Sequence, residues 1–418
     1  MKILLKNATL LNPSSPHHSS LKDILIVNGT IGEIGEGIKP DRDTKIIAHE
    51  NLHVSNGWTD CGVSFGEPGY EERETISHGL EVAAKSGFTK ILLNANTDPL
   101  PDSSSNIGHL IKMGQGHTTS LFPIGTLSVG SKGKQMASLF DMHTQGAIAF
   151  GDHKKSIDRS NLLKIALQYC QSFGGTVFSY PQHREIAGNG VMHEGATSAG
   201  IGLKGIPEMA ESIQVARDLE ILKYTGGKLH IPNLSTERGV DLVRDAKKIG
   251  LDVSCSVGLP HLFFDDSHME GYNPNLKIFP PIRSKTDQKA LQAGLLEGTI
   301  DMVSSMHEPM NIEHKQLEFE HAEPGSIGLE SCFGILNKLF PLDHVINFLT
   351  RGAGRFGIDA PNLEVGAAAD ITFFDPHQNF QFSAADIKST SKNSAFLGQE
   401  LQGKVIGSFN NGKLTIND

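Results

Sequence analysis

Several polar residues stand directly after short apolar runs, where a parallel strand would end. Asn96 follows the run 91–93, Asp152 follows the run 146–150, and His307 comes shortly after the run 302–303. In barrel enzymes such strand ends carry the chemistry. Carboxylate, amide and imidazole groups that converge there could bind a polar substrate or hold a metal ion that activates water.

Two of these residues also have a purely structural interpretation. Asn96 precedes Thr-x-Pro and could hydrogen-bond a tight turn. Asp152 is a lone carboxylate at a strand end, where it could cap a helix or pair with a cation. Both interpretations stay open. The candidate residues for a substrate pocket are Ser64, Asn96, Asp152, Asn233 and His261.

The middle of the chain has the pattern of an α/β protein. From residue 58 to about 358, brief apolar runs alternate with amphipathic segments of helix length. Repeated strand and helix indicate a parallel sheet, and roughly 300 residues suit a closed eight-stranded barrel. An open doubly wound sheet is the competing architecture. We therefore predict an α/β fold with a TIM-type (β/α)8 barrel over residues 56–359.

Both ends of the chain have a different pattern. Short stretches alternate apolar and polar residues, and turn signals such as Asn28-Gly29 and the segment 410–413 separate them. This pattern is typical of short antiparallel strands. We predict that residues 1–55 and 360–418 pair into one small β-sandwich domain beside the barrel.

The composition excludes some classes of protein. The 418 residues are 38% hydrophobic and 20% charged, which is ordinary for a globular protein. A net charge of -10 argues against binding to a nucleic-acid backbone. Four separated cysteines without a CxxC pair indicate reduced, structural thiols. The chain begins without an apolar leader and has no run of about 18 apolar residues, so we expect a cytoplasmic protein without a membrane span.

Three stretches carry a family resemblance that covers most of the chain. Asp60-Cys-Gly-Val-Ser-Phe-Gly-Glu-Pro-Gly69 resembles the first barrel strand of the dihydroorotases and their cyclic-amidohydrolase relatives, whose pattern is Asp-x-His-x-His-x-Arg-Glu-Pro-Gly. Leu229-His-Ile-Pro-Asn-Leu-Ser-Thr236 is similar to Leu-His-Ile-x-His-Val-Ser-Thr. Asp301-Met-Val-Ser-Ser-Met-His-Glu-Pro309 is similar to Asp-x-Ile-x-Thr-Asp-His-x-Pro. The resemblance implies the same barrel and a zinc-dependent ring-opening activity.

The positions that carry this chemistry in the family hold other residues here. The first-strand histidines are replaced by Gly62 and Ser64, and the arginine that grips the substrate carboxylate by Gly66. Met306 stands in the general-base position, and a thioether carries no proton for catalysis. Only Asp152 keeps a good metal donor, so we predict no zinc site and no intact catalytic residue. By resemblance, the ligand positions fall on Gly62, Ser64, Asp152, Ser179 or the two residues after it, Asn233 and Met306.

Three functions remain open. The family includes noncatalytic members that assemble with aspartate carbamoyltransferase, so the first is a structural or regulatory partner of that enzyme in de novo pyrimidine biosynthesis. The second is an active dihydroorotase, or another cyclic-amide hydrolase, whose zinc site is rebuilt from other histidines. The third is a module that binds a small molecule at the barrel mouth. A homo-oligomer is expected in each case. The histidines available for a rebuilt site are His153, His183, His193, His261 and His307.

Overall fold

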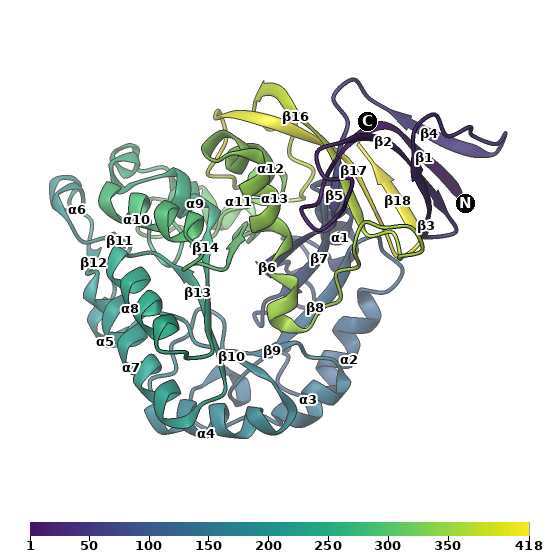
Figure 1. Cartoon of the computed structure of the whole chain (residues 1–418). Coiled ribbons are helices and arrows are strands. Elements are labelled where there is room, and N and C mark those ends of the chain that lie inside the picture. The colour runs from purple at the N-terminus through teal and green to yellow at the C-terminus, as the bar shows by residue number, and fades with distance from the viewer. Residues whose placement is uncertain (418) are drawn as a thin grey trace.

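Eight parallel strands form a barrel at the centre of the protein (Figure 1). The computed structural model describes residues 1–417. The side chains of β7 and β14 are buried along their whole length, as expected for strands covered on both faces. Ser304 Oγ donates a hydrogen bond of 3.1 Å to the carbonyl of Gly62, which joins the last strand to the first. The predicted barrel is therefore confirmed. Its strands are β6 (Trp58–Val63), β7 (Phe88–Leu93), β8 (Ser120–Gly125), β9 (Ala149–Phe150), β10 (Thr176–Phe178), β13 (Lys228–Leu234), β14 (Val253–Gly258) and β15 (Met302–Ser304).

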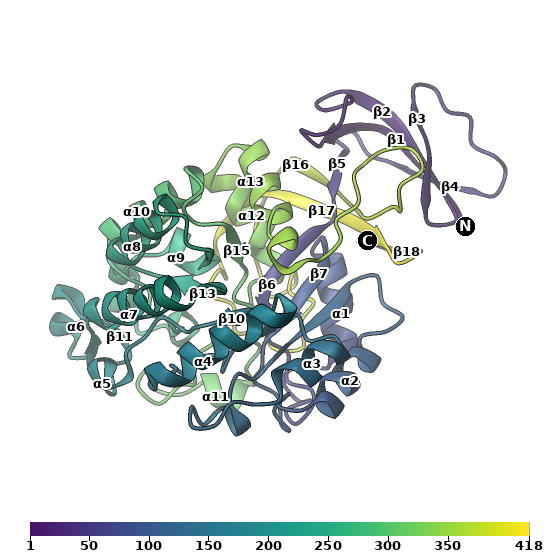
Figure 2. The same ribbon diagram turned by 60° about the horizontal axis from the view of Figure 1, so that its bottom comes forward.

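Helices surround the barrel on its outer side (Figures 1 and 2). Their starts are set by local capping: Thr236 Oγ1 accepts a hydrogen bond of 3.0 Å from the Gly239 amide, and Ser284 with Asp287 forms a capping box. The longer helices are α1 (Ile76–Lys85), α2 (Ser104–Met113), α3 (Leu139–Gln145), α4 (Ser160–Cys170), α7 (Met209–Thr225), α8 (Glu237–Lys248), α10 (Lys285–Leu296), α12 (Leu329–Leu339) and α13 (Leu342–Thr350).

Shorter elements lie in the loops that follow the strands. They are α5 (Arg184–Ala187), α6 (Ala196–Ile201), α9 (Leu259–Phe263), α11 (Ile312–Lys315) and the two-stranded pair β11 (Met192–His193) and β12 (Gly205–Ile206). None of the helices in residues 1–417 combines the length and apolar character needed to cross a bilayer. All four cysteines are free and buried.

Both ends of the chain build the β-rich domain that was predicted beside the barrel. β5 connects the two ends, because it pairs in parallel with β1 and antiparallel with β16. The strands are hydrogen-bonded into one continuous sheet of eight. They are β1 (Lys2–Leu11), β2 (Leu21–Val27), β3 (Thr30–Gly35), β4 (Thr44–Ala48), β5 (His53–Asn56), β16 (Ile371–Gln381), β17 (Glu400–Asn410) and β18 (Lys413–Ile416).

An aromatic cluster holds the barrel against this sheet. Trp58, the first residue of β6, is fully buried and its indole N–H donates to Ser55 Oγ at 2.9 Å. Its ring centroid lies 5.0 Å from that of Phe333 on α12 and 5.4 Å from that of Phe374 on β16. Because aromatic contacts of this kind add to the burial of large apolar surfaces, the cluster fixes the barrel to the sheet.

Candidate functional site

A small cavity lies at the carboxyl ends of the barrel strands, where barrel enzymes place their chemistry. Its volume is about 40 Å³, which is room for a few water molecules. Residues in or directly after all eight barrel strands contribute to it. They are Cys61, Gly62, Asn94, Ala95, Ile124, Gly151, His153, Lys154, Phe178, Tyr180, Pro232, Asn233, Ser256 and Ser304.

The first strand brings no side-chain donor into this cavity. Gly62 faces it without a side chain, and a Cβ built there would lie 3.2 Å from Ser304 Oγ. Ser64 is buried outside the cavity lining, and its hydroxyl accepts a hydrogen bond of 3.0 Å from Asn94 Nδ2. Asn94, rather than the predicted Asn96, lines the cavity on the second strand. Ser64 therefore contacts Asn94 and does not itself line the cavity.

The backbone after the first strand leaves no room for the arginine of the family pattern. A Cβ at Gly66 would lie 1.9 Å from the carbonyl oxygen of Tyr70. The amide of Tyr70 in turn donates to the carbonyl of Gly66 at 3.1 Å, so this loop folds back on the glycine. Any side chain at position 66 would force the loop to move. In this chain the backbone of the loop, together with the glycine, leaves no space for an arginine at position 66.

Asp152 is a buried structural carboxylate and does not line the cavity. It accepts a hydrogen bond of 3.0 Å from the Ser128 amide and another from the Ser128 hydroxyl. Burial raises the pKa of Asp152, and the bonds from Ser128 oppose that rise. The sequence prediction that Asp152 lines the pocket therefore differs from the structure, because the carboxylate is turned toward the loop after β8.

His153 and Lys154, the two residues after Asp152, line the cavity and lie close to the carboxylate of Glu308. Lys154 makes an ion pair with Glu308, and His153 Nε2 lies 3.7 Å from Glu308 Oε1. Burial works to raise the pKa of Glu308, but Lys154 and His153 outweigh it and bring the pKa to about 2. Burial lowers the pKa of His153. Sequence reasoning missed Glu308 and Lys154, since they lie 154 residues apart and neither stands in a family ligand position.

The remaining ligand positions offer only neutral oxygen donors on the cavity wall, which are Asn233 Oδ1 and the Tyr180 hydroxyl. Asn233 lines the cavity, and its Oδ1 is buried without a hydrogen-bond partner. Ser179 is buried beside the cavity and donates to Asp218 Oδ2 at 2.6 Å. The Met306 thioether packs over Gly258, where a Cβ would lie 2.1 Å from its sulfur. One amide oxygen is a weak ligand for zinc, which is bound in proteins mainly by imidazole, thiolate and carboxylate.

The histidines proposed for a rebuilt metal site have separate surroundings. His261 is buried, its Nε2 lies 2.9 Å from the carbonyl of Pro280, and burial lowers its pKa to about 4. His307 Nδ1 faces the amides of Gly328 and Leu329. His193 lies 3.4 Å from Arg283. Within residues 1–417, no group of three His, Cys, Asp or Glu side chains is arranged to hold a metal ion. The residues present do not fit the zinc centre that the family pattern implies.

Three strand ends at the mouth keep an unusual backbone. His153, Asn233 and Met306 have φ angles of 53°, 55° and 53°. This left-handed region is uncommon for residues other than glycine and is retained where the surroundings impose it. The mouth therefore combines this uncommon backbone with two side chains, Asn233 and Met306, that have no titratable group.

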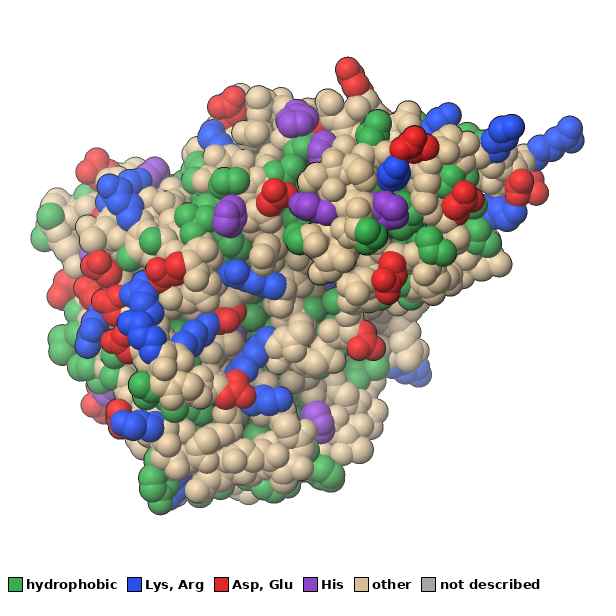
Figure 3. All heavy atoms as spheres, in the orientation of Figure 1, with side chains coloured by type: hydrophobic (Ala, Val, Ile, Leu, Met, Phe, Trp, Pro, Cys, Tyr) green, Lys and Arg blue, Asp and Glu red, His purple; other side chains and the backbone are tan. Residues whose placement is uncertain are grey.

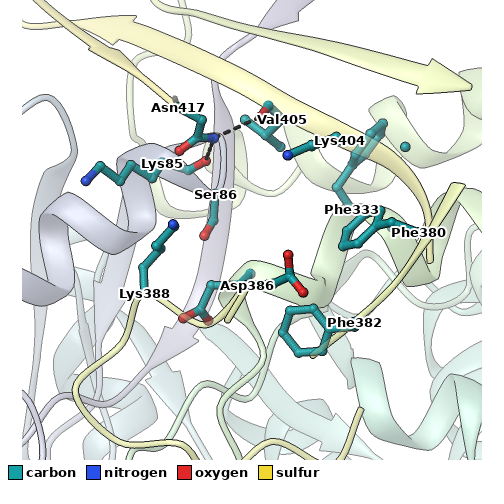
Figure 4. A pocket seen from close by; sticks show the side chains of 13 residues that line it. Lys85, Ser86, Phe333, Phe380, Phe382, Asp386, Lys388, Lys404, Val405 and Asn417 are labelled. Atoms are coloured by element: carbon teal, nitrogen blue, oxygen red, sulfur yellow. Dashed lines mark hydrogen bonds between the residues drawn. The ribbon is translucent and has the colours of Figure 1, made fainter. Parts of the chain in front are cut away.

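A second pocket of about 130 Å³ lies between α1, α12 and the β16–β17 hairpin (Figure 4). Phe333, Phe380 and Phe382 form one side of it, and Lys388 and Asp386 approach from the other. Asn417 Nδ2 bridges the carbonyls of Lys85 and Val405 at its edge. Although larger than the mouth cavity, this pocket is remote from the strand ends, so we place the candidate site at the mouth.

Comparison with known proteins agrees with the fold and the sequence motifs. The chain is 34% identical to a dihydroorotase of Citrifermentans bemidjiense over 97% of both chains. It is 35% identical to a dihydroorotase of Pelotomaculum thermopropionicum over 100% of this chain and 99% of that one. The chain belongs to the dihydroorotase family. A Dihydro-orotase-like family model matches residues 54–238.

Solved structures of low sequence identity share the architecture. An L-hydantoinase (dihydropyrimidinase) from Arthrobacter aurescens aligns with a TM-score of 0.86 at 21% identity, covering 99% of this chain and 96% of that chain. A D-hydantoinase (dihydropyrimidinase) from a Thermus species aligns with a TM-score of 0.82 at 19% identity, covering 100% and 95%. At this identity the likeness concerns the fold alone.

Proposed function

We propose that this member of the dihydroorotase family has no hydrolytic activity and serves as a structural or regulatory partner of aspartate carbamoyltransferase in de novo pyrimidine biosynthesis. The observation that carries the first half is the carbonyl of Tyr70, which stands 1.9 Å from a Cβ at Gly66. A site that had merely lost one side chain would keep the space for it. Here the backbone fills the position of the substrate-gripping arginine.

The donors around the cavity support the same proposal. Metal-assisted hydrolysis needs a cation that polarises the carbonyl and a base that moves the proton. Among residues 1–417, the ligand-position oxygens on the cavity wall are Asn233 Oδ1 and the Tyr180 hydroxyl, whose pKa is raised by burial. Met306 fills the base position with a thioether. His153 on the same wall is buried, and this burial lowers its pKa.

The partner half of the proposal rests on the family and on the intact barrel. A folded barrel without hydrolytic groups is still a rigid surface on which a second enzyme can assemble. The protein is further proposed to be a homo-oligomer, as most soluble assemblies of this kind are symmetric.

Co-migration tests the partner half. The purified protein is mixed with the aspartate carbamoyltransferase of the same organism and run on a size-exclusion column with light-scattering detection. We expect a complex of defined mass and a change in carbamoyltransferase activity on mixing. A Tyr224→Ala variant, altered at an exposed side chain of α7, serves as a folded control. Separate elution together with unchanged carbamoyltransferase kinetics would contradict the partnership.

A further inference from the structure

A basic groove adjoins the barrel mouth on the loops that follow β8, β9 and β10. Its volume is about 690 Å³, and it shares Lys154 with the mouth cavity. Six of its eleven lining residues are lysine or arginine. The basic groove is lined by Ser131, Lys132, Gly133, Lys134, Lys154, Lys155, Ser156, Asp158, Arg159, Gln182 and Arg184.

Most of these cations have no carboxylate partner. Lys154 is paired with Glu308, whereas the other five form no ion pair within 4.0 Å among residues 1–417. Asp158 is the single acidic residue on the lining. The chain as a whole carries a net charge of -10. Five unpaired cations around one concavity repel one another and raise the local positive potential, which an anionic ligand would relieve.

The groove also offers a hydroxyl without a partner. Ser131 lines it, is only 6% exposed, and its Oγ has no hydrogen-bond partner. A buried hydroxyl left unsatisfied costs free energy, which a ligand oxygen acceptor would recover. Ser131 stands between Gly130 and Lys132, in a loop whose left-handed residues turn the chain around the groove. The lining of the groove therefore combines several cations with a buried serine whose hydroxyl has no partner.

We propose that the basic groove binds a small ligand that carries a phosphate group. A phosphoryl group brings a charge near -2 and three strong acceptor oxygens, which match the lysines, the arginines and the Ser131 hydroxyl. The groove volume falls in the range of small-molecule sites, which is about 300–1,000 Å³. This inference adds a ligand site to the proposed function and does not depend on it.

The size and charge of the protein argue against a long polyanion as the occupant. Nucleic acid is held by a basic surface that follows its backbone over many phosphates. On the face in Figure 3, acidic and basic side chains are interspersed without such a stripe. The positive charge of the basic groove is local, which favours a compact anion.

Calorimetric titration of the purified protein with inorganic pyrophosphate tests the proposal. We expect saturable binding to the wild type that Lys132→Gln/Lys134→Gln weakens at least tenfold. Lys155→Gln, on the loop after β9, should weaken pyrophosphate binding about threefold. Because this single variant lies on another loop, its weaker binding would not result from misfolding of the double variant. Lys39→Gln/Lys45→Gln makes the same charge change on two exposed residues, one in the loop before β4 and one in β4, and should leave binding unchanged.

A Ser131→Ala variant distinguishes specific phosphate binding from nonspecific charge attraction. Ser131→Ala keeps every charge and should still weaken pyrophosphate binding several-fold, because the hydroxyl donor is lost. No binding by the wild type would overturn the proposal. Equal weakening by the groove and control double variants would also overturn it. Binding of a heparin fragment or an oligonucleotide, without binding of pyrophosphate, would show instead that the groove recognises a polymer.

Discussion

Two sets of residues in the barrel differ in how well they match the family. The first set holds backbone segments together and is here called the frame; the second lies at the barrel mouth. In the frame, Asp60 accepts hydrogen bonds of 3.1 Å from the amides of Gly62 and Ser305, and Thr236 Oγ1 accepts one of 3.0 Å from the amide of Gly239. These residues hold backbone together. At the mouth, Gly62 has no side chain and Asn233 Oδ1 has no hydrogen-bond partner. Residues that hold the fold match the family, and residues that would perform its chemistry do not.

The frame and the mouth also differ in whether their buried polar side chains have hydrogen-bond partners. Glu211 on α7 accepts bonds from the amides and hydroxyls of both Ser235 and Thr236, which end a family-matching stretch. Removing such a residue would leave buried donors unpaired, which is costly. Catalytic side chains are selected for activity and usually contribute little to stability. Their loss at this mouth is therefore compatible with an intact barrel.

The largest expected effect lies in the frame. Trp58→Ala removes the ring that connects β6 with Phe333 and Phe374 and should lower the free energy of unfolding by about 3–5 kcal/mol. Urea unfolding followed by circular dichroism measures this. Tyr224→Ala, at a side chain that is 78% exposed, is the control and should change stability by less than about 0.5 kcal/mol. Equal effects of the two variants would break the distinction between frame and surface.

A smaller effect is expected for the charged centre of the mouth. Glu308→Gln leaves Lys154 without its partner and should cost about 2–3 kcal/mol at pH 7. The pKa of Glu308 is about 2 in the folded protein, below its ordinary value of 4.5. Its ionised form therefore stabilises the fold above about pH 5, and this contribution is lost as the pH falls toward 2.

Unfolding measured at several pH values checks that sign. The difference in stability between the wild type and Glu308→Gln should be largest near pH 7 and should shrink steadily below pH 5. A difference that stays constant from pH 7 to pH 3 would show that the ion pair with Lys154 is not its source.

Substitutions at Gly66 and Gly62 test whether the space beside each glycine is filled by backbone or left open. Gly66→Ala places a methyl group 1.9 Å from the Tyr70 carbonyl and should destabilise the protein by about 1–2 kcal/mol as the loop shifts. Gly62→Ala meets Ser304 Oγ at 3.2 Å and should cost less, because a side-chain hydroxyl can move by a few tenths of an ångström. Thermal unfolding of both variants checks the order. If Gly66→Ala were the milder change, the space for an arginine would still exist.

The smallest effect is expected for metal. Added zinc stabilises a folded protein only if it binds the folded state more tightly than the unfolded chain. Since no convergent ligand set exists in residues 1–417, the thermal midpoint should move by less than about 1 °C in zinc, whereas an active dihydroorotase stripped of metal should gain several degrees. A comparable gain for this protein would place a metal site at the mouth.

The sequence predicted the barrel and the second sheet because their signals are local and repeated. Strand-length apolar runs and amphipathic segments alternate along the middle of the chain, and turn residues separate short strands at both ends. The family motifs then placed Gly62 and Asn233 at the mouth, where both line the cavity. Such positions follow from the register of a strand.

The details of the cavity depended on features that one sequence does not display. A left-handed turn at His153 directs Asp152 toward Ser128 and brings His153 and Lys154 to the cavity. Similarly, Asn94 rather than Asn96 faces the cavity. The partner of Lys154 is Glu308, and only the closure of the barrel brings these distant residues together.

Turnover of dihydroorotate is the most direct test of the central claim that this mouth carries no hydrolytic machinery. The purified, folded protein is assayed for ring opening with zinc supplied and with chelator, beside an active dihydroorotase at the same concentration. We expect no turnover above the chelator control from this protein, while the active enzyme turns over. Saturable, zinc-dependent turnover that the chelator abolishes would contradict the claim.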